Sequence, residues 1–369
     1  MKPLVSVIIP VYNSADTIRF VVEAAARQTY PESRVEIIVV DNNSTDGTKE
    51  ALAGLSVQYV FEARRNRSRA RNVGAAHASG DFLAFLDADC VVPVNWLESL
   101  VQSLDAHWLG AAQARVQRRG EPMPSREFRA GHYFLPYLDS CTLLVRRSAF
   151  DAATGFNEEL NRAVDMDFSF RVLSCGFGFA WVPDTVVIKH HDLSPRQAGR
   201  RGWVGGQNMF LLDRAWDHRV RRSGPRLFWD RLKFGARTVA TEVAHNRRLA
   251  AVTVAEQSSK LVSYAIAVVR GRGVQVVSLP VVGSVPRVLG HDKYIVVDGE
   301  AVLVFDALAR SVISLSPPQS QVLRYLLDTR VAVPHDIDAI TEATSLSVDD
   351  ARLGLAKVER LLGGVETTV

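Results

Sequence analysis

The sequence predicts an α/β protein with a mainly parallel central sheet, followed by a smaller α+β unit. Two patterns indicate this. Short apolar segments alternate with helical patterns over the first part of the chain, as in parallel sheets covered on both faces. After residue 285, three strand-like segments precede three helix-like ones, which is typical of a small winged-helix arrangement. The length of 369 residues also favours two domains.

Predicted strands and helices alternate along the first part of the chain. Strands are expected at residues 4–9, 35–40, 57–61, 82–86, 141–147 and 185–188. A helix with Ile18, Val21, Val22 and Ala25 on its apolar side follows the first strand. Further helices are expected at 49–55, up to about residue 78, at 93–105 and at 164–171. We divide the chain into residues 1–215, a helical extension and linker at 216–284, and the C-terminal unit at 285–369.

Charge and composition limit the class of protein. Residues 285–369 contain 8 Lys and Arg against 12 Asp and Glu, so the overall charge of +4 hides a basic first part and an acidic C-terminal unit. The three cysteines are few and widely spaced, which favours a reducing compartment. No window reaches the roughly 18 uninterrupted apolar residues of a membrane span. A cytoplasmic protein is expected, with peripheral contact at the inner membrane as a further possibility.

Polar side chains follow successive strands of the predicted sheet. Because the carboxyl ends of parallel strands meet at one edge, where α/β proteins bind ligands, these residues are expected to share a nucleotide site. Asp41 can accept hydrogen bonds from a base or ribose. Arg71, with Arg67, can neutralise a diphosphate. Asp87 and Asp89 offer hard oxygen ligands for Mg²⁺ or Mn²⁺.

Four motifs resemble those of family 2 glycosyltransferases and occur in that family's order. They are Val5–Asn13, Ile38–Thr48, Ala70–Gly74 and Gly80–Asp89. The resemblance implies a GT-A fold, which is Rossmann-like, and a nucleoside-diphosphate sugar donor. It also implies a divalent metal ion, Mg²⁺ or Mn²⁺, and inversion at the anomeric carbon.

The resemblance also implies roles for single residues. Asp41 would meet the base and Arg71 the donor. Asp89 would bind the metal, and Asp87 would lie near the ribose or the metal. The remaining nucleotide-sugar contacts implied by the first motif are Pro10, Tyr12 and Asn13. Arg67 lies outside the four motifs and is assigned to the diphosphate from its charge alone.

The acceptor side requires a base, because a sugar acceptor hydroxyl is a poor nucleophile until a carboxylate takes its proton. The family's segment usually reads Glu-Asp-x-Asp, with its first Asp as the base, and this resemblance assigns the role to Asp165. Asp167 is the competing candidate. The sequence departs from the family pattern at three places: Val164 replaces the Glu, Asn42 follows Asp41, and Cys90 stands where another Asp is frequent.

Three further segments have two readings each. His190 and His191 follow a strand and either supply an imidazole metal ligand or sit at a surface strand end. Residues 200–208 form either a basic lid over the diphosphate or an ordinary surface loop. The basic amphipathic pattern at 214–237 either lies on an anionic membrane or packs on its own domain.

The C-terminal unit has strands expected at 293–297, 301–305 and 311–315 and helices at 317–327, 334–344 and 348–362. Its acidic charge argues against nucleic acid as a partner. Val302–Leu303, Asp306, the third strand and the first helix resemble the PqqD-like peptide-binding domain, the RiPP recognition element. The resemblance implies a leader peptide that adds a strand to an exposed sheet edge beside the last helix. The alternative is a structural appendage or dimer contact.

The predicted function is that of an inverting, metal-dependent glycosyltransferase acting on a ribosomally made peptide that the C-terminal unit recruits. One alternative is a cell-envelope polysaccharide or glycolipid glycosyltransferase at the membrane surface. The other is a non-catalytic peptide-binding scaffold with a degenerate site.

Overall fold

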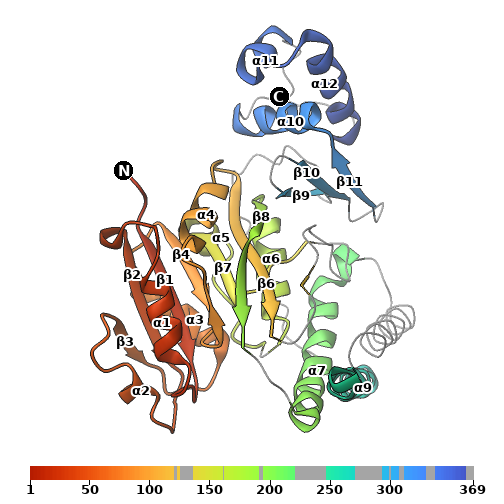
Figure 1. Cartoon of the computed structure of the whole chain (residues 1–369). Coiled ribbons are helices and arrows are strands. Elements are labelled where there is room, and N and C mark those ends of the chain that lie inside the picture. The colour runs from red at the N-terminus through yellow and green to blue at the C-terminus, as the bar shows by residue number, and fades with distance from the viewer. Residues whose placement is uncertain are drawn as a thin grey trace.

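One sheet of 11 strands runs through the molecule in the order β11-β10-β9-β8-β6-β7-β4-β1-β2-β3, with β5 paired to β8 (Figure 1). The computed structural model describes residues 1–119, 123–124, 136–160, 162–190, 194–220, 247–270, 293–298, 301–306, 311–329 and 337–362. The strands are β1 (Val5–Val11), β2 (Val35–Asp41), β3 (Gln58–Phe61), β4 (Phe82–Leu86), β5 (Cys90–Val91), β6 (Leu109–Arg118), β7 (Thr142–Arg146), β8 (Gly178–Lys189), β9 (Lys293–Asp298), β10 (Ala301–Asp306) and β11 (Ser311–Leu315).

The predicted α/β fold with a mostly parallel central sheet is confirmed. From β3 to β9 along the sheet, every strand runs in the same direction except β7, which is antiparallel to β4 and β6. The carboxyl ends of β1, β2, β4, β6 and β8 therefore point to the same edge, where the sequence placed the site.

Helices cover both faces of this sheet. They are α1 (Ile18–Ala26), α2 (Thr48–Ala51), α3 (Arg67–His77), α4 (Trp96–Ser103), α5 (Arg147–Ala152), α6 (Val164–Ser174), α7 (Pro195–Val220), α9 (Arg247–Arg270), α10 (Pro317–Thr329), α11 (Ile337–Thr344) and α12 (Val348–Leu362), with a 3-10 turn at Glu32–Arg34. The buried side chains of α1 are the four residues that the sequence placed on its apolar face.

The alternation of side chains along β1 explains the two layers. Val5, Val7 and Ile9 pack in the core with α1 and α4, whereas Ile8 points to the opposite face and packs in the core with α5 and α6. Successive side chains of a strand point to opposite faces, so a continuously apolar strand requires helices on both. The short apolar runs of the sequence are therefore buried strands.

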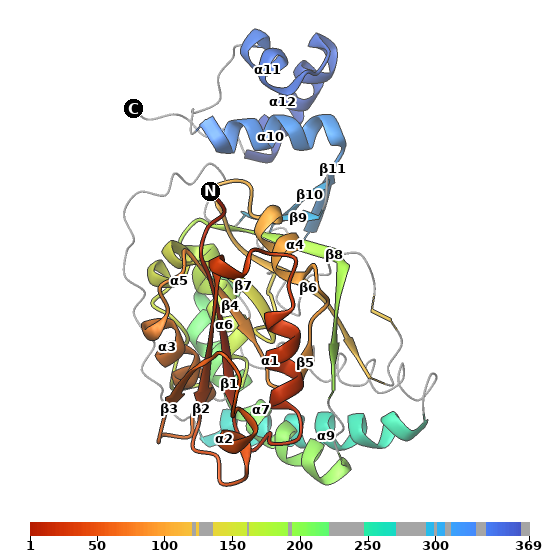
Figure 2. The ribbon, with the colours of Figure 1, turned by 60° about the vertical axis from the view of Figure 1, so that its left-hand side comes forward.

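The C-terminal unit extends the same sheet. β9 pairs in parallel with β8 over Phe179–Trp181, and β10 and β11 follow in antiparallel order. Trp108, just before β6, donates a hydrogen bond from Nε1 to Asp328 Oδ1 at 2.9 Å. Figures 1 and 2 show α10, α11 and α12 above these strands, at the end of the molecule opposite α7 and α9. The unit thus meets the amino ends of β6 and β8.

Three sequence-based expectations need correction. Residues 200–208 were expected in a loop, but they lie inside the 26-residue helix α7, and their glycines serve helix packing. The strand expected at 185–188 is the last part of the 12-residue β8. Strand β6 was not anticipated, because Gln113 and Arg115 interrupt its apolar pattern.

Two expectations fall partly outside the described residues. Of the amphipathic pattern at 214–237, the structure describes only the first part, in α7, and of the helix expected at 334–344 it describes Ile337–Thr344. Within the described ranges, no helix has the length and apolar character needed to cross a membrane.

Candidate active site

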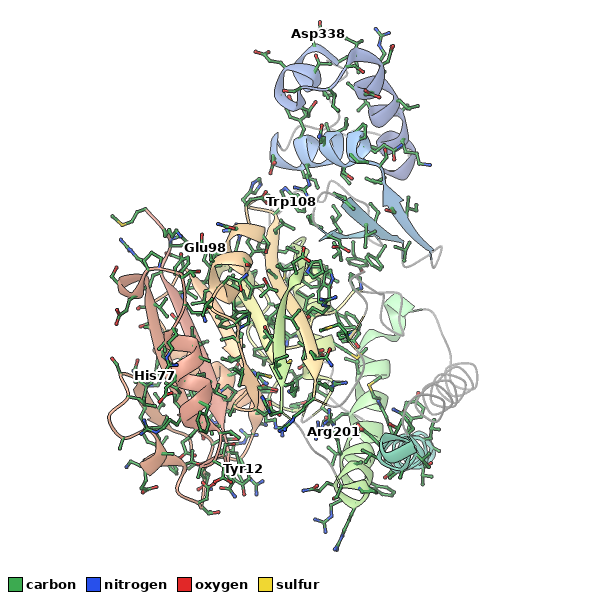
Figure 3. All side chains as sticks on the ribbon, in the orientation of Figure 1. Tyr12, His77, Glu98, Trp108, Arg201 and Asp338 are labelled. Carbon is green, nitrogen blue, oxygen red and sulfur yellow. The ribbon has the colours of Figure 1, made fainter. Side chains whose placement is uncertain are left out.

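A cavity of about 1350 Å³ opens at the carboxyl ends of the strands. Its walls come from the ends of β1, β4, β6 and β8, the amino-terminal parts of α3 and α6, and one side of the α7–α9 pair. Figure 3 shows Tyr12 and Arg201 at this end of the molecule and Trp108 at the other, near the C-terminal unit. The cavity is larger than most drug-sized ligand sites, so it has room for a nucleotide and a second substrate.

Arg71 lies at the base of the cavity. It is 3% exposed, and its Nη2 donates to Asp87 Oδ1 at 2.7 Å while the guanidinium group lies over the Phe156 ring, 5.5 Å from its centroid. Its Nε and Nη1 are buried and have no partner among the described residues. Buried donors without partners are costly, so this pair of nitrogens suits the oxygens of a bound anion.

Close packing of α3 on the sheet fixes this arginine. Asn66 caps the helix by accepting a hydrogen bond from Arg69 N at 2.9 Å. A Cβ at Gly74 would lie 2.4 Å from Ile8 Cγ2, so glycine is required for this approach. The Ala70–Gly74 motif therefore has a packing role beside its charged residue.

Lys189 links the two carboxylates of the Asp-x-Asp motif. Its Nζ lies 2.8 Å from Asp87 Oδ2 and 3.3 Å from Asp89 Oδ1. Burial alone would raise the pKa of Asp87, but Lys189 and Arg71 outweigh it and hold that pKa well below its usual range. The pKa of Lys189 is raised, because Asp87 outweighs the lowering effect of burial. Both partners therefore stay charged at neutral pH.

The sequence reasoning missed this lysine. The strand-end rule that selected Asp87 and Asp89 applies equally to Lys189, the last residue of β8. The sequence-based prediction instead used only the two histidines that follow it. His190 is exposed and does not line the cavity, and its backbone N–H donates to Asp89 O at 2.7 Å. His191 lies outside the described residues.

The motif carboxylates offer the hard oxygen donors that Mg²⁺ and Mn²⁺ prefer, and both are partly exposed to the cavity. Within the described part of the chain, no group of three His, Cys, Asp or Glu side chains forms a ready-made metal site. The donor set therefore fits an ion that completes its coordination with water and substrate oxygens, held by Asp89 and Asp87.

The other residues predicted to contact the nucleotide-sugar donor fall into two groups. Pro10, Tyr12 and Arg67 line the cavity, and Tyr12 stacks with Arg65, whose Cζ lies 3.9 Å from the ring centroid. Asp41 and Asn13 instead shape the loop after β2. Asp41 is 3% exposed and accepts hydrogen bonds from Ser44 N and from the Tyr59 hydroxyl, both at 2.8 Å.

Asn13 Oδ1 accepts a hydrogen bond from Thr45 N in the same loop, at 2.8 Å. Neither Asn13 nor Asp41 is among the cavity residues, whereas Asn42 is. The predicted contact of Asp41 with a base therefore stays a prediction, and the described geometry gives this side chain an internal role.

Asp165 faces the same cavity from the first turn of α6. Its Oδ1 accepts a hydrogen bond from the Ser140 hydroxyl at 2.8 Å, and the residue is partly exposed. Burial and the neighbouring Asp139 carboxylate raise its pKa, outweighing the opposing effects of Arg71 and Ser140. A carboxylate with a raised pKa is a stronger base, as proton abstraction requires.

Asp167, the competing candidate, has a structural role. It forms a buried ion pair with Arg171 at 2.8 Å, one helical turn later. The Arg171 guanidinium group also donates to the backbone oxygens of Ala153 and Gly155. Asp167 therefore anchors α6 to the preceding loop.

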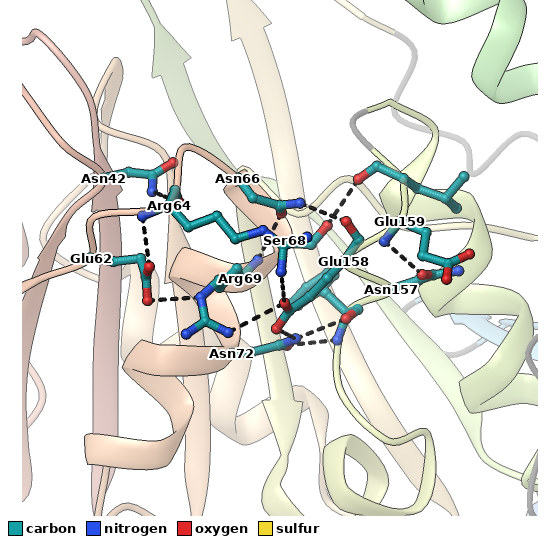
Figure 4. Close-up of polar contacts among 12 residues, drawn as sticks. Asn42, Glu62, Arg64, Asn66, Ser68, Arg69, Asn72, Asn157, Glu158 and Glu159 are labelled. Atoms are coloured by element: carbon teal, nitrogen blue, oxygen red, sulfur yellow. Dashed lines mark hydrogen bonds and ion pairs between the residues drawn. The ribbon is translucent and has the colours of Figure 1, made fainter.

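A network of hydrogen bonds and ion pairs joins α3 to the loop that leads into α6 (Figure 4). Asn66 Nδ2 donates to Glu158 O at 2.6 Å, and Asn72 pairs with the backbone of Phe156 in both directions at 2.8 Å. Arg69 bridges Glu62 and Glu158 at 2.9 and 3.5 Å. The network sets the position of Asp165 relative to Arg71, although the two residues are distant in sequence.

The α7–α9 pair closes the cavity through close backbone contact. A Cβ at Gly202 would lie 2.0 Å from Glu256 O, and one at Gly206 would lie 2.1 Å from Lys260 O. Glycines spaced four residues apart face the same neighbour, so they let two helices approach closely. Sequence reasoning took these glycines as a sign of a loop.

Fold and cavity together are those of an α/β protein with a large, charged cavity at the carboxyl ends of its strands. The glycosyl transferase family 2 model matches residues 6–171. Glycosyltransferase AglE of Haloferax volcanii is 30% identical over 209 residues, covering 52% of this chain and 68% of that protein. This chain belongs to glycosyl transferase family 2, and it is a glycosyltransferase.

Two further matches are informative. A pre-mycofactocin glycosyltransferase of Mycobacterium tuberculosis is 28% identical over 229 residues, covering 55% of this chain and 46% of that protein. The solved mannosyltransferase PcManGT of Pyrobaculum calidifontis, in complex with GDP-Man and Mn²⁺, aligns with a TM-score of 0.54 at 21% identity, covering 74% of this chain and 89% of that one. This likeness confirms the predicted GT-A fold.

Proposed function

We propose that the chain transfers a sugar from a nucleoside-diphosphate sugar to an acceptor hydroxyl in one inverting displacement. One observation carries the proposal. The unpaired nitrogens of Arg71 and the motif carboxylates line the same cavity as Asp165, whose raised pKa suits a base. The complex of PcManGT with GDP-Man and Mn²⁺ supports this choice of donor and metal class.

In the proposed mechanism Asp165 takes the proton of the acceptor hydroxyl as its oxygen attacks the anomeric carbon. The bond from that carbon to the diphosphate oxygen breaks, and Arg71 and Lys189 stabilise the charge that develops on the leaving group. A single attack from the opposite side inverts the configuration. A divalent ion at Asp89 and Asp87 would add positive charge at the same diphosphate.

The test is release of nucleoside diphosphate from a panel of UDP- and GDP-sugars, with and without Mn²⁺. The expected result is metal-dependent release that Asp89→Ala abolishes, while Asp151→Ala, a change at an exposed aspartate of α5, leaves it intact. Release at the wild-type rate by Asp89→Ala would contradict the proposed metal-binding role of Asp89. The absence of release with every donor would favour the alternative of a non-catalytic binding protein.

The acceptor is proposed to be a ribosomally made peptide held by residues 285–369, with residues 216–284 as the helical extension and linker to the enzyme domain at 1–215. The three strands and three helices match the PqqD-like pattern in order, and the relative named a pre-mycofactocin glycosyltransferase is compatible. β11 forms one end of the sheet, and its Val312 side chain is 44% exposed. An added peptide strand would lie along this edge.

Geometry sets a spacer length for such a peptide. β9 pairs with β8 up to Trp181, at one wall of the cavity, whereas Lys189 lies beside the motif carboxylates. The five residue steps of β6 from Gln113 to Arg118 span the same interval, so the two points are roughly 17 Å apart at about 3.3 Å per residue. A segment docked on β11, three strands away from β8, would then need at least about six extended residues between it and the modified residue. Precursor peptides with spacers of about four and about sixteen residues test this, and only the longer should be modified efficiently.

The docking site has its own test. Binding of a precursor peptide to the full chain, measured by calorimetry, should weaken at least about tenfold in Val312→Asp, because a charge would enter the predicted strand contact. The matched control is Val254→Asp, because Val254 on α9 is exposed to a similar extent, 41%. Equal binding by both variants would leave the unit as a structural appendage.

A second candidate acceptor is an envelope polysaccharide or glycolipid at the inner membrane. The α7–α9 pair exposes four large apolar side chains, Trp203, Val204, Val254 and Val262, which are 37% to 53% exposed. Flotation with anionic vesicles decides this, since an interfacial helix pair would carry the chain to the lipid fraction. A chain that stays in the aqueous fraction would exclude the membrane-bound form.

A further inference from the structure

The described residues that line the cavity carry more positive charge than a donor requires. Ten lysine and arginine side chains face five carboxylates. Each phosphate of a sugar diphosphate carries about one negative charge, and a divalent ion would cancel both. A positive excess therefore remains after the donor and metal are placed.

The excess lies partly on the acceptor side, in a group that we call the acceptor-side cations: Arg115, Arg162 and Arg201. Arg162 precedes Asp165 by three residues, so the two Cα atoms are at most about 11 Å apart. Arg201 and Arg115 reach the same cavity from α7 and β6. An anion bound here would lie close to the proposed base.

The backbone of Arg162 is held in place, but its guanidinium group forms no ion pair with the described residues. Its backbone N–H donates to Asn208 Oδ1 at 3.1 Å, and among the described residues no hydrogen bond or ion pair involves its guanidinium group. Burial, and then the like charges of Arg201 and Arg67, lower its pKa to about 10. These effects outweigh the opposing effect of the Glu256 and Asp165 carboxylates. A cation held in such a place is unfavourable until an anion joins it.

Arg115 gives an independent indication. It is 9% exposed, and its buried Nε has no partner among the described residues, while Nη1 makes only a long contact of 3.5 Å to Pro124 O. Glu256 offers partial compensation, but it pairs with Arg201 at 3.3 Å. The cluster therefore keeps unsatisfied donors that face the cavity.

Resting on the proposed transferase function, we propose that the acceptor-side cations bind an anionic group of the acceptor, a carboxylate or phosphate near the hydroxyl that Asp165 deprotonates. A guanidinium group recognises either anion through paired N–H donors. Such an anchor would select acidic acceptors over neutral ones and would orient the hydroxyl toward the base.

The test is calorimetric titration of inorganic phosphate into the full chain loaded with Mn²⁺ and one equivalent of UDP or GDP, added to fill the proposed donor site. A second phosphate site is expected in the wild type, at least about tenfold weaker in Arg162→Met and in Arg201→Met because a charged donor is lost. Arg27→Met removes an arginine just after α1 whose side chain is 75% exposed, and it should bind phosphate as the wild type does. Arg162→Lys should recover part of the affinity.

Titration with glutarate, a dicarboxylate, distinguishes a carboxylate group of the acceptor from a phosphate group. Tighter glutarate binding supports an acidic peptide acceptor, and tighter phosphate binding supports a phosphorylated one. Unchanged affinity in both Arg162→Met and Arg201→Met, or no second site in the wild type, would overturn the proposal. The titration needs no turnover, so its failure is distinct from a failure to release nucleoside diphosphate.

Discussion

The two halves of the cavity differ in how their charges are balanced. On the donor side, Arg71, Lys189 and Asp87 form a compact set in which each carboxylate oxygen of Asp87 has a cationic partner. On the proposed acceptor side, the Asp165 carboxylate accepts a hydrogen bond from the Ser140 hydroxyl, and the guanidinium group of Arg162 forms no hydrogen bond or ion pair with the described residues. The charge of Asp87 is therefore balanced within the protein, whereas Asp165 and Arg162 of the proposed acceptor half form no such close ion pair with the described residues.

The largest effect should come from Asp165→Asn. Loss of a general base lowers kcat by about 10²–10⁴-fold. Because the folded-state pKa of Asp165 is raised, its ionised form costs stability at neutral pH, and that cost grows as pH rises through the pKa. Asparagine removes the cost, so the Tm at pH 7 should rise while turnover collapses.

Asp167→Asn is the matched control on the same helix. It breaks a buried ion pair with Arg171 and leaves that cation without its partner, so stability should fall by about 3–5 kcal/mol. Thermal unfolding of both variants separates the two roles. A fall in Tm for Asp165→Asn would show that Asp165, like Asp167, stabilises the fold.

The next effect concerns the α7–α9 wall of the acceptor half. Gly206→Ala would press a methyl group against Lys260 O and should cost about 1–3 kcal/mol of stability. At the neighbouring Gly205 a Cβ would meet only side-chain carbons of Lys260 at 3.9 Å, so Gly205→Ala should instead gain up to about 1 kcal/mol of helix propensity. Urea denaturation of both variants measures the difference, and equal stabilities would exclude the close packing.

A smaller effect is expected from Lys189→Met, which disturbs the balance of the donor half. Removing a cation 3.3 Å from Asp89 should tighten binding of Mn²⁺ alone by about tenfold, since the ion no longer meets a neighbouring positive charge. Electron paramagnetic resonance of free Mn²⁺ measures this directly. Weaker Mn²⁺ binding in the variant would mean that Lys189 organises the carboxylates instead of competing with the ion.

The smallest effect concerns the pH profile. Asp165 must be ionised to act as a base, so kcat/KM should fall with decreasing pH through a pKa above the usual range of aspartate. Asp139→Asn removes the second of the causes that raise this pKa, and the acid limb should move to lower pH. An unmoved limb would assign it to another group.

The donor half could be predicted from sequence because each of its motifs is local. A buried strand and the polar residues directly after it are adjacent in the chain, and the parallel topology brings Asp87 and Arg71 together. Lys189 comes from a strand distant in sequence, but the same rule would have found it. The loop at Asp41 shows the limit of this reasoning, because a strand-end carboxylate can turn inward and hold its own loop.

The acceptor half depends on contacts that no local pattern reports. Gly202 and Gly206 have the composition of a loop until α9 is packed against them. The position of Asp165 depends on the network between Asn72 and Phe156, more than 80 residues apart. The pairing of β9 with β8 likewise became visible only in the folded sheet.

The most direct test of the two-sided cavity separates donor binding from chemistry. Calorimetry with the nucleotide sugar that the wild type turns over should give Asp165→Asn an unchanged Kd, together with the loss of transfer. Arg71→Met should weaken donor binding by at least about tenfold, because it removes the charged donors proposed to meet the diphosphate. Full turnover by Asp165→Asn, or wild-type donor affinity in Arg71→Met, would contradict this account.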